Sequence, residues 1–450
     1  MPTVTRAEGS LRHALVLMTS SSLLVPLAGL ITAPILAHGL GVEGRGLAAA
    51  AVAPNSLIVS VATFGLPEAL TYFLARHPQL TRRGLVWSGV TGFVLGLVCL
   101  LIAVASLDFL SAGDARLGQL ILIGTVLAVP QLLVNLLRGA ASGRQMWRAV
   151  AIERLLNSAL RIVVLAVLYA AGQLTVLNAV YVLTIAPILA AVAYVMLLRR
   201  PPGGPENLLF EGKVLPALLT LGSRIWIGAV ASMLLARIGP ILFVPLSNVA
   251  ELGLYTVAIT VSDVPLVVAL GIRDALYGVS SRRADAGQLA TTARVTTLVG
   301  AAGCLVIGAT LPLWIDLAFG SGFRAALWPS WILLLCAVVN IPGFLAAAGL
   351  GAWGRPGTRS VGLLLTLAVN LPLFILLVPT TGAVGGALAG LASSTVSTVF
   401  MVVAASRVIG IPAHAFFLPT MRDVRFLAGE ATRLSEKIAR RGQKTPDASQ

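Results

Sequence analysis

Residues 85–106 read L-V-W-S-G-V-T-G-F-V-L-G-L-V-C-L-L-I-A-V-A-S, 22 residues without one charged side chain. A helix needs about 20 such residues to cross the ~30 Å hydrocarbon core of a bilayer, so this run predicts a transmembrane helix. Eleven further apolar runs have comparable lengths, and they lie at approximately residues 14–37, 47–74, 118–137, 152–172, 176–198, 216–246, 253–278, 295–315, 327–350, 360–379 and 384–406. The sequence therefore predicts an all-α polytopic membrane protein with 12 transmembrane helices.

The composition of the chain supports this fold class. Of its 450 residues, 57% are hydrophobic and 11% are charged, whereas soluble domains contain about 25% charged residues. This composition excludes a soluble enzyme. The 3 cysteines lie inside apolar runs and the 4 histidines are scattered singly. We therefore expect no metal site, no disulfide framework and no cofactor.

The distribution of basic residues predicts the orientation in the membrane. The chain has 32 Lys and Arg against 17 Asp and Glu, and most of the basic residues lie in loops on the side of the N-terminus. Arg45, Arg116 and Arg324 are the three that lie in loops on the opposite side. By the positive-inside rule, both termini are cytoplasmic and the chain is a multi-pass protein of the cytoplasmic (inner) membrane. Because the basic residues are spread over many short loops, a nucleic acid partner is excluded.

The loops on the outer side leave little room for an enzyme. The two longest, about residues 107–117 and 316–326, have eleven residues each. A membrane-bound glycan polymerase or ligase would need a long outer loop with catalytic charges. The sequence therefore predicts a protein without enzymatic activity.

An internal repeat divides the chain into two halves. Residues 33–40 read A-P-I-L-A-H-G-L and residues 239–246 read G-P-I-L-F-V-P-L, while residues 65–70 (G-L-P-E-A-L) match residues 271–276 (G-I-R-D-A-L) at the same offset. Six helices separate the copies, so the halves have the same orientation in the membrane. This pattern predicts two six-helix lobes related by a pseudo-two-fold axis along the membrane normal, unless the similarity is a chance result of a low-complexity apolar sequence.

The repeat and the polar stretches predict the domain boundaries. The stretch after Arg199 is rich in Pro and Gly, as linkers are. Residues 419–444 place apolar side chains on one helical face and basic side chains on the rest, which predicts a helix lying on the anionic inner leaflet. The expected domains are an N-terminal lobe (1–198), a cytoplasmic linker (199–215), a C-terminal lobe (216–407) and a basic amphipathic tail (408–450).

Three short motifs carry a resemblance to a known family. Residues 40–46 read L-G-V-E-G-R-G, residues 251–258 read E-L-G-L-Y-T-V-A, and residues 319–325 read F-G-S-G-F-R-A. In these motifs the chain resembles the oligosaccharide flippases of the multidrug/oligosaccharidyl-lipid/polysaccharide exporter superfamily, with the likeness covering about residues 10–407. Val42 stands where that family usually has a proline, and Arg45 stands where it usually has an aromatic residue.

The resemblance implies an architecture and an activity. It implies two six-helix lobes around a central cavity that opens alternately to each side of the membrane. It also implies that the headgroup of a lipid-linked sugar crosses through this cavity while the polyprenyl tail stays in the bilayer. The motifs consist mostly of turn and packing residues, so they carry information about the fold more than about the substrate.

Arginines inside the apolar runs are the candidate substrate-binding residues. Arg154, Asn157 and Arg161 recur at a spacing that places them on one stripe of a helix, and Arg224 and Arg237 lie within the run 216–246. Guanidinium groups suit a pyrophosphate because they combine charge with paired donors. The alternative is structural, with the side chains snorkelling to headgroups or pairing with a carboxylate between helices.

Acids and amides complete the set of candidates. Asp263 lies deep in the run 253–278 and could couple transport to a proton or sodium ion, or pair with an arginine for structure. Glu68 and Asp274 occupy equivalent positions of the repeat, which indicates gating or a lobe-to-lobe contact at the inner rim, unless they are solvated acids at helix ends beside Arg76 and Arg273. Amides in the apolar runs could bind sugar hydroxyls or bond helices together; they are Asn55, Gln131, Asn135, Asn340 and Asn370.

These observations predict a transporter that flips a lipid-linked oligosaccharide of the polyprenyl-pyrophosphate type by alternating access. The expected partners are the lipid-linked glycan, membrane lipids, and a coupling proton or sodium ion. Deep in the runs there are three arginines against one aspartate, which favours an anionic substrate. The alternatives are a cation-coupled multidrug exporter of the same superfamily and a polytopic membrane protein that transports nothing.

Overall fold

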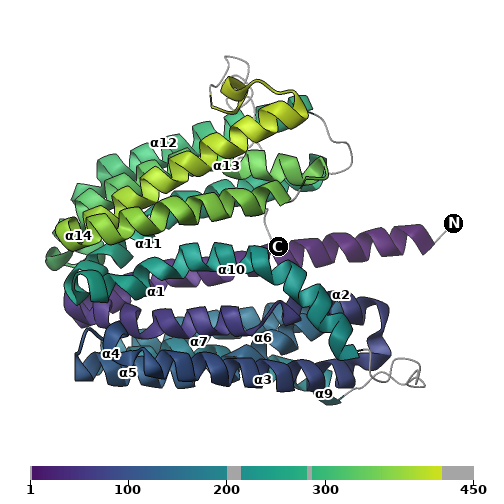
Figure 1. Ribbon diagram of the computed structural model, residues 1–450, viewed down its shortest axis with the longest axis horizontal. Coiled ribbons are helices and arrows are strands. Elements are labelled where there is room, and N and C mark those ends of the chain that lie inside the picture. The colour runs from purple at the N-terminus through teal and green to yellow at the C-terminus, as the bar shows by residue number, and fades with distance from the viewer. Residues whose placement is uncertain (1–2, 200–213, 281–285, 356, 418–450) are drawn as a thin grey trace, which may run out of the picture.

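The computed structural model describes residues 3–199, 214–280, 286–355 and 357–417, and the regular elements within these ranges are all helices (Figure 1). Within them, side chains are described except at residues 3–23, 25, 198–199, 224–225, 227–229, 231, 266–280 and 288. The α-helices are α1 (Thr3–Ala62), α2 (Leu66–Arg76), α3 (Thr81–Ala105), α4 (Leu107–Leu110), α5 (Ala115–Val126), α6 (Ala128–Gly143), α7 (Trp147–Ala170), α8 (Val176–Ala190), α9 (Val195–Arg199), α10 (Val214–Leu246), α11 (Val249–Ser280), α12 (Ala286–Phe319), α13 (Leu327–Ala352) and α14 (Gly357–Ile409). Short 3-10 helices are η1 (Pro78–Leu80), η2 (Ala191–Tyr194), η4 (Ser321–Ala326) and η5 (Ala413–Phe416).

The predicted apolar runs lie largely on these helices. In the described part of the chain, 7 helices are long and apolar enough to cross a membrane. They are Pro26–Ala62, Pro78–Ala105, Ala115–Gly143, Val176–Leu197, Leu289–Phe319, Ser321–Ala352 and Gly357–Ile409. The protein is therefore an all-helical, multi-pass membrane protein, while the division into twelve spans stays a prediction. The linker, apart from its ends, and the tail beyond residue 417 lie outside the described residues.

Two of the longest helices are interrupted by a glycine. Gly41 divides α1 with φ 67° and ψ −173°, and Gly382 divides α14 with φ 55° and ψ −129°. Glycine adopts positive φ without the steric penalty of a Cβ. At Gly382 the break also frees the N–H of Ala383, which donates to Oε2 of Glu251 at 2.7 Å. Each glycine thus marks the point where one long helix becomes two segments.

The two halves of the chain form two groups of helices. Figure 1 shows α1 to α9 on one side and α11 to α14 on the other, with α10 running between them. We call the end where α3 begins and α6 ends the basic side, because Arg82, Arg83 and Arg144 lie there. Nη1 of Arg144 donates to Oγ1 of Thr81 at 3.1 Å across this end. The opposite end, which holds the turn at Gly41, is the far side.

Buried clusters join α1 and α5 to α11–α14 on the far side, whereas on the basic side the cluster of the first half extends to α10 and not to α11–α14. The largest cluster includes Ile121 of α5, Phe243 of α10 and Ile315 of α12, so both halves contribute to it. On the basic side, one cluster is centred on α2 and α6 and contains Leu132. Another cluster, on α12 to α14, contains Leu345. Because hydrophobic packing connects the halves at one end, the space between them is closed on the far side.

A glycine contact brings α1 and α11 together on the far side. A Cβ added at Gly46 would clash with the carbonyl oxygen of Val249, and a Cβ added at Gly253 would clash with the carbonyl oxygen of Val42. The contact is reciprocal, because Gly46 and Gly253 lie 207 residues apart and the residues that they meet, Val249 and Val42, also lie 207 residues apart. We call this pair of backbone approaches the far-side contact.

The far-side contact predicts that Gly46→Ala and Gly253→Ala open the far side. An added methyl group in a tight contact costs about 1–3 kcal/mol, which corresponds to a population shift of about fivefold or more. The measurement uses Ser56→Cys on α1 in a chain without its native cysteines. An impermeant maleimide added from the far side should label this cysteine faster in the alanine variants. Gly89→Ala is the matched control, because a Cβ there meets no atom within 4 Å. Unchanged labelling in both glycine variants would show that this contact does not close the far side.

Candidate functional site

Between the two halves lies a cavity of about 400 Å³ that we call the central cavity. It is lined by α1, α6, α7 and α8 from one half, by α10, and by α11 from the other half. Its lining residues are Arg45, Ala48, Ala49, Val52, Ala53, Asn55, Ser56, Gln131, Arg161, Leu183, Pro187, Ala236, Arg237, Pro240, Thr256, Ile259 and Thr260. Both halves of the chain therefore contribute to one polar cavity.

Three arginines dominate the charge of the central cavity. Arg45, Arg161 and Arg237 come from α1, α7 and α10, and none of the described residues that line the cavity is acidic. Arg161 lies within electrostatic range of both Arg45 and Arg237. Within the described residues, none of the three forms an ion pair at 4.0 Å or less. The cavity is therefore strongly cationic.

Two of these guanidinium groups contain a buried donor that the described residues do not satisfy. The Nε atoms of Arg45 and Arg161 are buried and have no hydrogen-bond partner there. Most buried polar groups in folded proteins are hydrogen-bonded, so an unsatisfied charged donor that lines a cavity is a candidate for binding a ligand. Phosphate oxygens are acceptors that fit such donors.

Amide side chains line the same cavity and also hold its walls together. Nδ2 of Asn55 donates to the carbonyl oxygen of Gly124 at 2.7 Å, and Nε2 of Gln131 donates to the carbonyl oxygen of Thr184 at 2.6 Å. These bonds join α1 to α5 and α6 to α8. Their amide NH2 groups therefore fix the helices that position the arginines.

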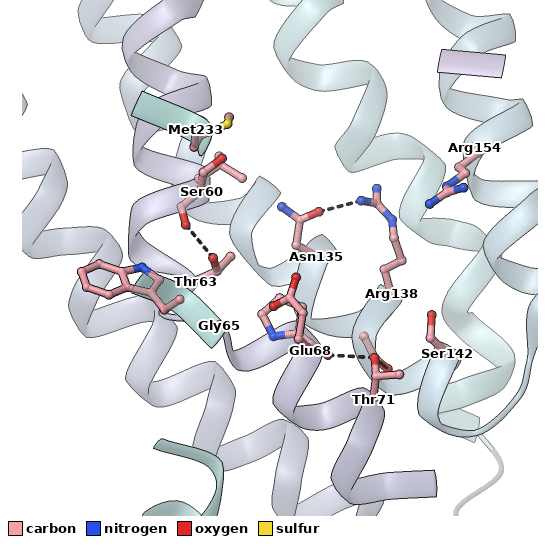
Figure 2. Close-up of a pocket in the computed structure, with 14 residues that line it drawn as sticks. Ser60, Thr63, Gly65, Glu68, Thr71, Asn135, Arg138, Ser142, Arg154 and Met233 are labelled. Atoms are coloured by element: carbon pink, nitrogen blue, oxygen red, sulfur yellow. Dashed lines mark hydrogen bonds between the residues drawn. The ribbon is translucent and has the colours of Figure 1, made fainter. Parts of the chain in front are cut away.

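A second cavity of about 420 Å³ lies nearer the basic side, and we call it the basic-side cavity (Figure 2). It is lined by α1, α2, α6, α7, α10 and the turn between α1 and α2. Its lining residues are Val59, Ser60, Thr63, Gly65, Pro67, Glu68, Thr71, Asn135, Arg138, Gly139, Ser142, Arg154, Trp226 and Met233. It contains two arginines and one acid, so its charge differs from that of the central cavity.

The two cavities follow one another along the same helices. On α1 the lining passes from Ser56 to Val59, and on α6 it passes from Gln131 to Asn135. Steps of three or four residues correspond to one helical turn. The two cavities are therefore adjacent segments of one polar path that runs from the basic side toward the far side.

A buried carboxylate fixes one wall of the basic-side cavity. Glu153 on α7 is 0% exposed and accepts hydrogen bonds from Nε and Nη2 of Arg138 at 3.0 and 2.9 Å. The hydroxyl of Tyr194 also donates to Glu153, at 3.2 Å. Nη1 of Arg138 donates to Oδ1 of Asn135 at 2.9 Å. Glu153 thus sets the orientation of the Arg138 guanidinium.

The structure brings several predicted site residues together. Arg161, Arg237 and Asn55 line the central cavity, whereas Arg154 and Glu68 line the basic-side cavity. Arg161 and Arg237 are two of the three arginines that the sequence places deep in the apolar runs.

Other predicted residues lie outside these linings. Asn157 is buried on α7 and lines neither cavity, and its Oδ1 has no hydrogen-bond partner in the described part of the chain. Asp263 on α11 is exposed and lies within electrostatic range of Arg237. Arg224 lies on α10 and Asp274 on α11, but their side chains are outside the described residues.

Two amides in the second half bond helices together. Nδ2 of Asn340 on α13 donates to Oγ of Ser394 at 3.1 Å, and Nδ2 of Asn370 on α14 donates to Oγ of Ser393 at 3.1 Å. This matches the structural alternative for intramembrane amides. Among the described residues, these two amides serve helix packing.

Sequence reasoning does not identify two residues that line the cavities, Arg45 and Arg138, or the buried partners Glu153 and Tyr194 behind Arg138. Arg45 lies between two apolar runs and Arg138 follows the run 118–137, so hydropathy predicts a loop position for both. The signal for Arg45 was present in the motif 40–46, where an arginine replaces the usual aromatic residue. Glu153 and Tyr194 interact with Arg138 over long separations in the chain, and sequence spacing gave no signal for this pairing.

Comparisons with known proteins agree with this fold. Residues 10–283 match the model of a family described as polysaccharide biosynthesis protein. No protein with a curated description matches the chain in sequence.

Several solved structures are similar. The lipid II flippase MurJ in an inward closed conformation has 12% identity, and the alignment covers 89% of each chain with a TM-score of 0.71. An inward-facing multidrug resistance MATE family transporter of the MOP superfamily has 14% identity, with 85% of this chain and 95% of that chain covered and a TM-score of 0.65. The eukaryotic MATE transporter AtDTX14 has 16% identity, with 91% and 98% covered and a TM-score of 0.56.

At these identities the structural likeness establishes the fold, and the family model, which covers more than half of the chain, establishes the family. The chain belongs to the polysaccharide biosynthesis protein family and has the fold of the MOP-superfamily transporters.

Proposed function

We propose that this protein flips a lipid-linked oligosaccharide of the polyprenyl-pyrophosphate type across the cytoplasmic membrane by alternating access. The observation that carries the proposal is the central cavity, where Arg45, Arg161 and Arg237 meet without an acid among the described lining residues. Family membership supports the same function. The likeness to the lipid II flippase MurJ is consistent with it.

The proposed substrate suits the chemistry of the central cavity. A pyrophosphate is expensive to remove from water, and a site of low dielectric must replace its hydration with positive charge and donors. Guanidinium groups provide both and bind phosphate oxygens through paired N–H groups. Hydroxyls and amides along the two cavities, such as Ser56, Ser60 and Asn55, supply hydrogen-bonding groups for sugar hydroxyls.

The proposed mechanism uses the arrangement of the halves. Residues 1–198 and 216–407 would act as two lobes, joined by the linker 199–215, that rock about the central cavity. The basic side would face the cytoplasm, with both termini there, as the positive-inside rule requires. With the far-side contact formed, the substrate would approach from the basic side, and breaking that contact would expose it to the other face of the membrane.

A cation-coupled multidrug exporter is the alternative, and it is favoured by the likeness to MATE transporters. An exporter of cationic drugs would favour a cavity with acids and aromatic residues. Among the described residues of the central cavity lining, none is acidic or aromatic. The charge of the cavity therefore supports an anionic substrate.

The first prediction concerns the three arginines. Arg45→Gln, Arg161→Gln and Arg237→Gln should each slow flipping by about ten- to a hundredfold, the equivalent of ~1.5–3 kcal/mol for a hydrogen bond to a charged group. The corresponding lysine variants should keep partial activity, because lysine keeps the positive charge but lacks the paired N–H donors of a guanidinium. Flipping is measured in proteoliposomes as the exposure of a fluorescent polyprenyl-pyrophosphate-linked oligosaccharide to an impermeant quencher.

The control for this series is Arg116→Gln, which removes an exposed arginine at the start of α5 and should leave flipping unchanged. All variants should insert into membranes at the same yield as the unmodified chain. Full flipping by the triple glutamine variant would contradict the proposal and favour the exporter. In that case, efflux of a cationic dye by the same vesicles would be the next measurement.

The second prediction concerns Asp263, which we propose as the coupling residue. Asp263→Asn should keep the fold and make the rate of flipping independent of a proton or sodium gradient. An amide does not take up a proton near neutral pH, and it lacks the negative charge that attracts a sodium ion. The measurement compares flipping rates with and without each gradient.

If Asp263 instead only neutralises Arg237, the gradient dependence should persist in the Asp263→Asn variant. The folded yield would then fall in Arg237→Gln and recover in the double variant Arg237→Gln/Asp263→Asn. These two patterns separate a coupling role from a structural role.

A further inference from the structure

The basic-side cavity is lined by Arg138, which pairs with a buried carboxylate that does not line the cavity. Arg138 donates to Glu153 through Nε and Nη2, and to Asn135 through Nη1. Glu153 is 0% exposed, whereas the Arg138 side chain is 31% exposed and lines the cavity. A guanidinium has five N–H groups, so the three bonds leave two for a group inside the cavity.

The carboxylate is held in place independently of Arg138. Glu153 also accepts the hydroxyl hydrogen bond of Tyr194 from η2, 41 residues further along the chain. Because Tyr194 also holds this carboxylate, Glu153 does not follow the guanidinium if a ligand attracts it. The ion-paired carboxylate of Glu153 therefore competes with any external anion for Arg138.

A second arginine faces the first across the cavity. Arg154 follows Glu153 directly on α7 and lines the same cavity. Figure 2 shows its guanidinium pointing toward that of Arg138, and the two groups lie within electrostatic range. Two like charges that face each other are stabilised when an anion lies between them. Hydroxyl groups of Ser60, Thr71 and Ser142 line the same space.

The acids make this cavity a weaker anion site than the central one. The two arginines of the basic-side cavity are accompanied by Glu68 in its lining and by Glu153, which is buried behind Arg138. In the central cavity, three arginines have no acid among the described lining residues. Arg154 and Arg161 lie seven residues apart on α7, which is about 10 Å along the helix. An anion that enters from the basic side therefore passes from nearly balanced charge to an excess of positive charge.

We propose that Arg138 and Arg154 form a second anion site, which receives the phosphate of the substrate before the central cavity does, and that Glu153 keeps its affinity low. The ligand class is a phosphate or pyrophosphate ester. The inference rests on the proposed function for the identity of the substrate. It assigns Arg138 a binding role and Glu153 the role of a positioning residue. Weak binding at this site lets the anion move on toward Arg161.

The alternative is that Arg138 and Glu153 form an ion pair that only holds α6 against α7. Both roles predict damage when Arg138 alone is removed, because Glu153 would remain buried without a partner. The two roles differ for Glu153→Gln. A binding site should gain affinity when its internal competitor loses its charge, whereas a purely structural pair should only lose stability.

The experiment titrates inorganic pyrophosphate into the full-length protein in phosphatidylcholine nanodiscs, followed by calorimetry. The unmodified protein should show a tighter and a weaker site. Glu153→Gln should tighten the weaker site by about tenfold, because one charge-assisted competitor is removed. The double variant Arg138→Gln/Glu153→Gln leaves no buried unpaired carboxylate and should lose the weaker site alone. Arg144→Gln, at the end of α6 outside the cavity, is the matched control and should change neither site.

Two outcomes would overturn the proposal. Pyrophosphate binding that is identical in Glu153→Gln and the unmodified protein, with lower thermal stability of the variant, would show a structural pair only. Loss of the weaker site in phosphatidylglycerol nanodiscs would show that phospholipid headgroups occupy it instead. Arg161→Gln tests the proposed function separately, since it should remove the tighter site alone. If Arg161→Gln removes neither site, the central cavity does not bind phosphate. The proposal for the Arg138 site is then still tested by the affinity change in Glu153→Gln.

Discussion

A guanidinium at the centre of a membrane span costs about 2.5–3.5 kcal/mol on insertion scales, so it must face a polar cavity or a partner. This constraint governs the arrangement of the first half of the chain and α10. Arg45, Arg161 and Arg237 enter one cavity from three helices, and Arg138 lies against a buried carboxylate. The apolar faces of the same helices form the buried clusters around these cavities. The polar cavities and the apolar core therefore have the same physical cause, which is that charged groups are kept away from hydrocarbon.

The helical, membrane-spanning character of the fold could be predicted from the sequence because hydrophobic runs of helical length have few other solutions in a bilayer. The interruptions within the runs were harder to predict. The residues between the first two runs contain charges, which predicts a loop, yet α1 continues through them with a break at Gly41. The turn at residues 63–65, where Gly65 has φ 68°, lies inside an apolar run and gave no compositional signal. A single glycine at positive φ changes the direction of a helix without changing hydropathy.

The candidate site could be predicted where a charge stands alone in an apolar run, which is how Arg161 and Arg237 were found. Arg45 and Arg138 could not be predicted as cavity residues in this way. They lie just outside apolar runs, where a basic residue is usually solvated by headgroups. In the structure Arg45 lies within α1, after the break at Gly41, and Arg138 lies within α6, so tertiary packing places both side chains in cavities. The ion pair between Arg138 and Glu153 and the hydrogen bond from Tyr194 likewise depend on how α6, α7 and η2 pack. Local spacing carries no information about such contacts.

The position of Arg45 links the cationic cavity to the far-side contact. Arg45 directly precedes Gly46, whose backbone lies against Val249 of α11. Thr256 and Thr260 of α11 line the central cavity about two to three turns beyond Val249. Any motion that separates α1 from α11 there also moves Arg45 and opens the wall of the cavity. Within the proposed mechanism, opening the far side and weakening the hold on a pyrophosphate are thus one event, because the same segment of α1 carries both the closing glycine and a binding arginine.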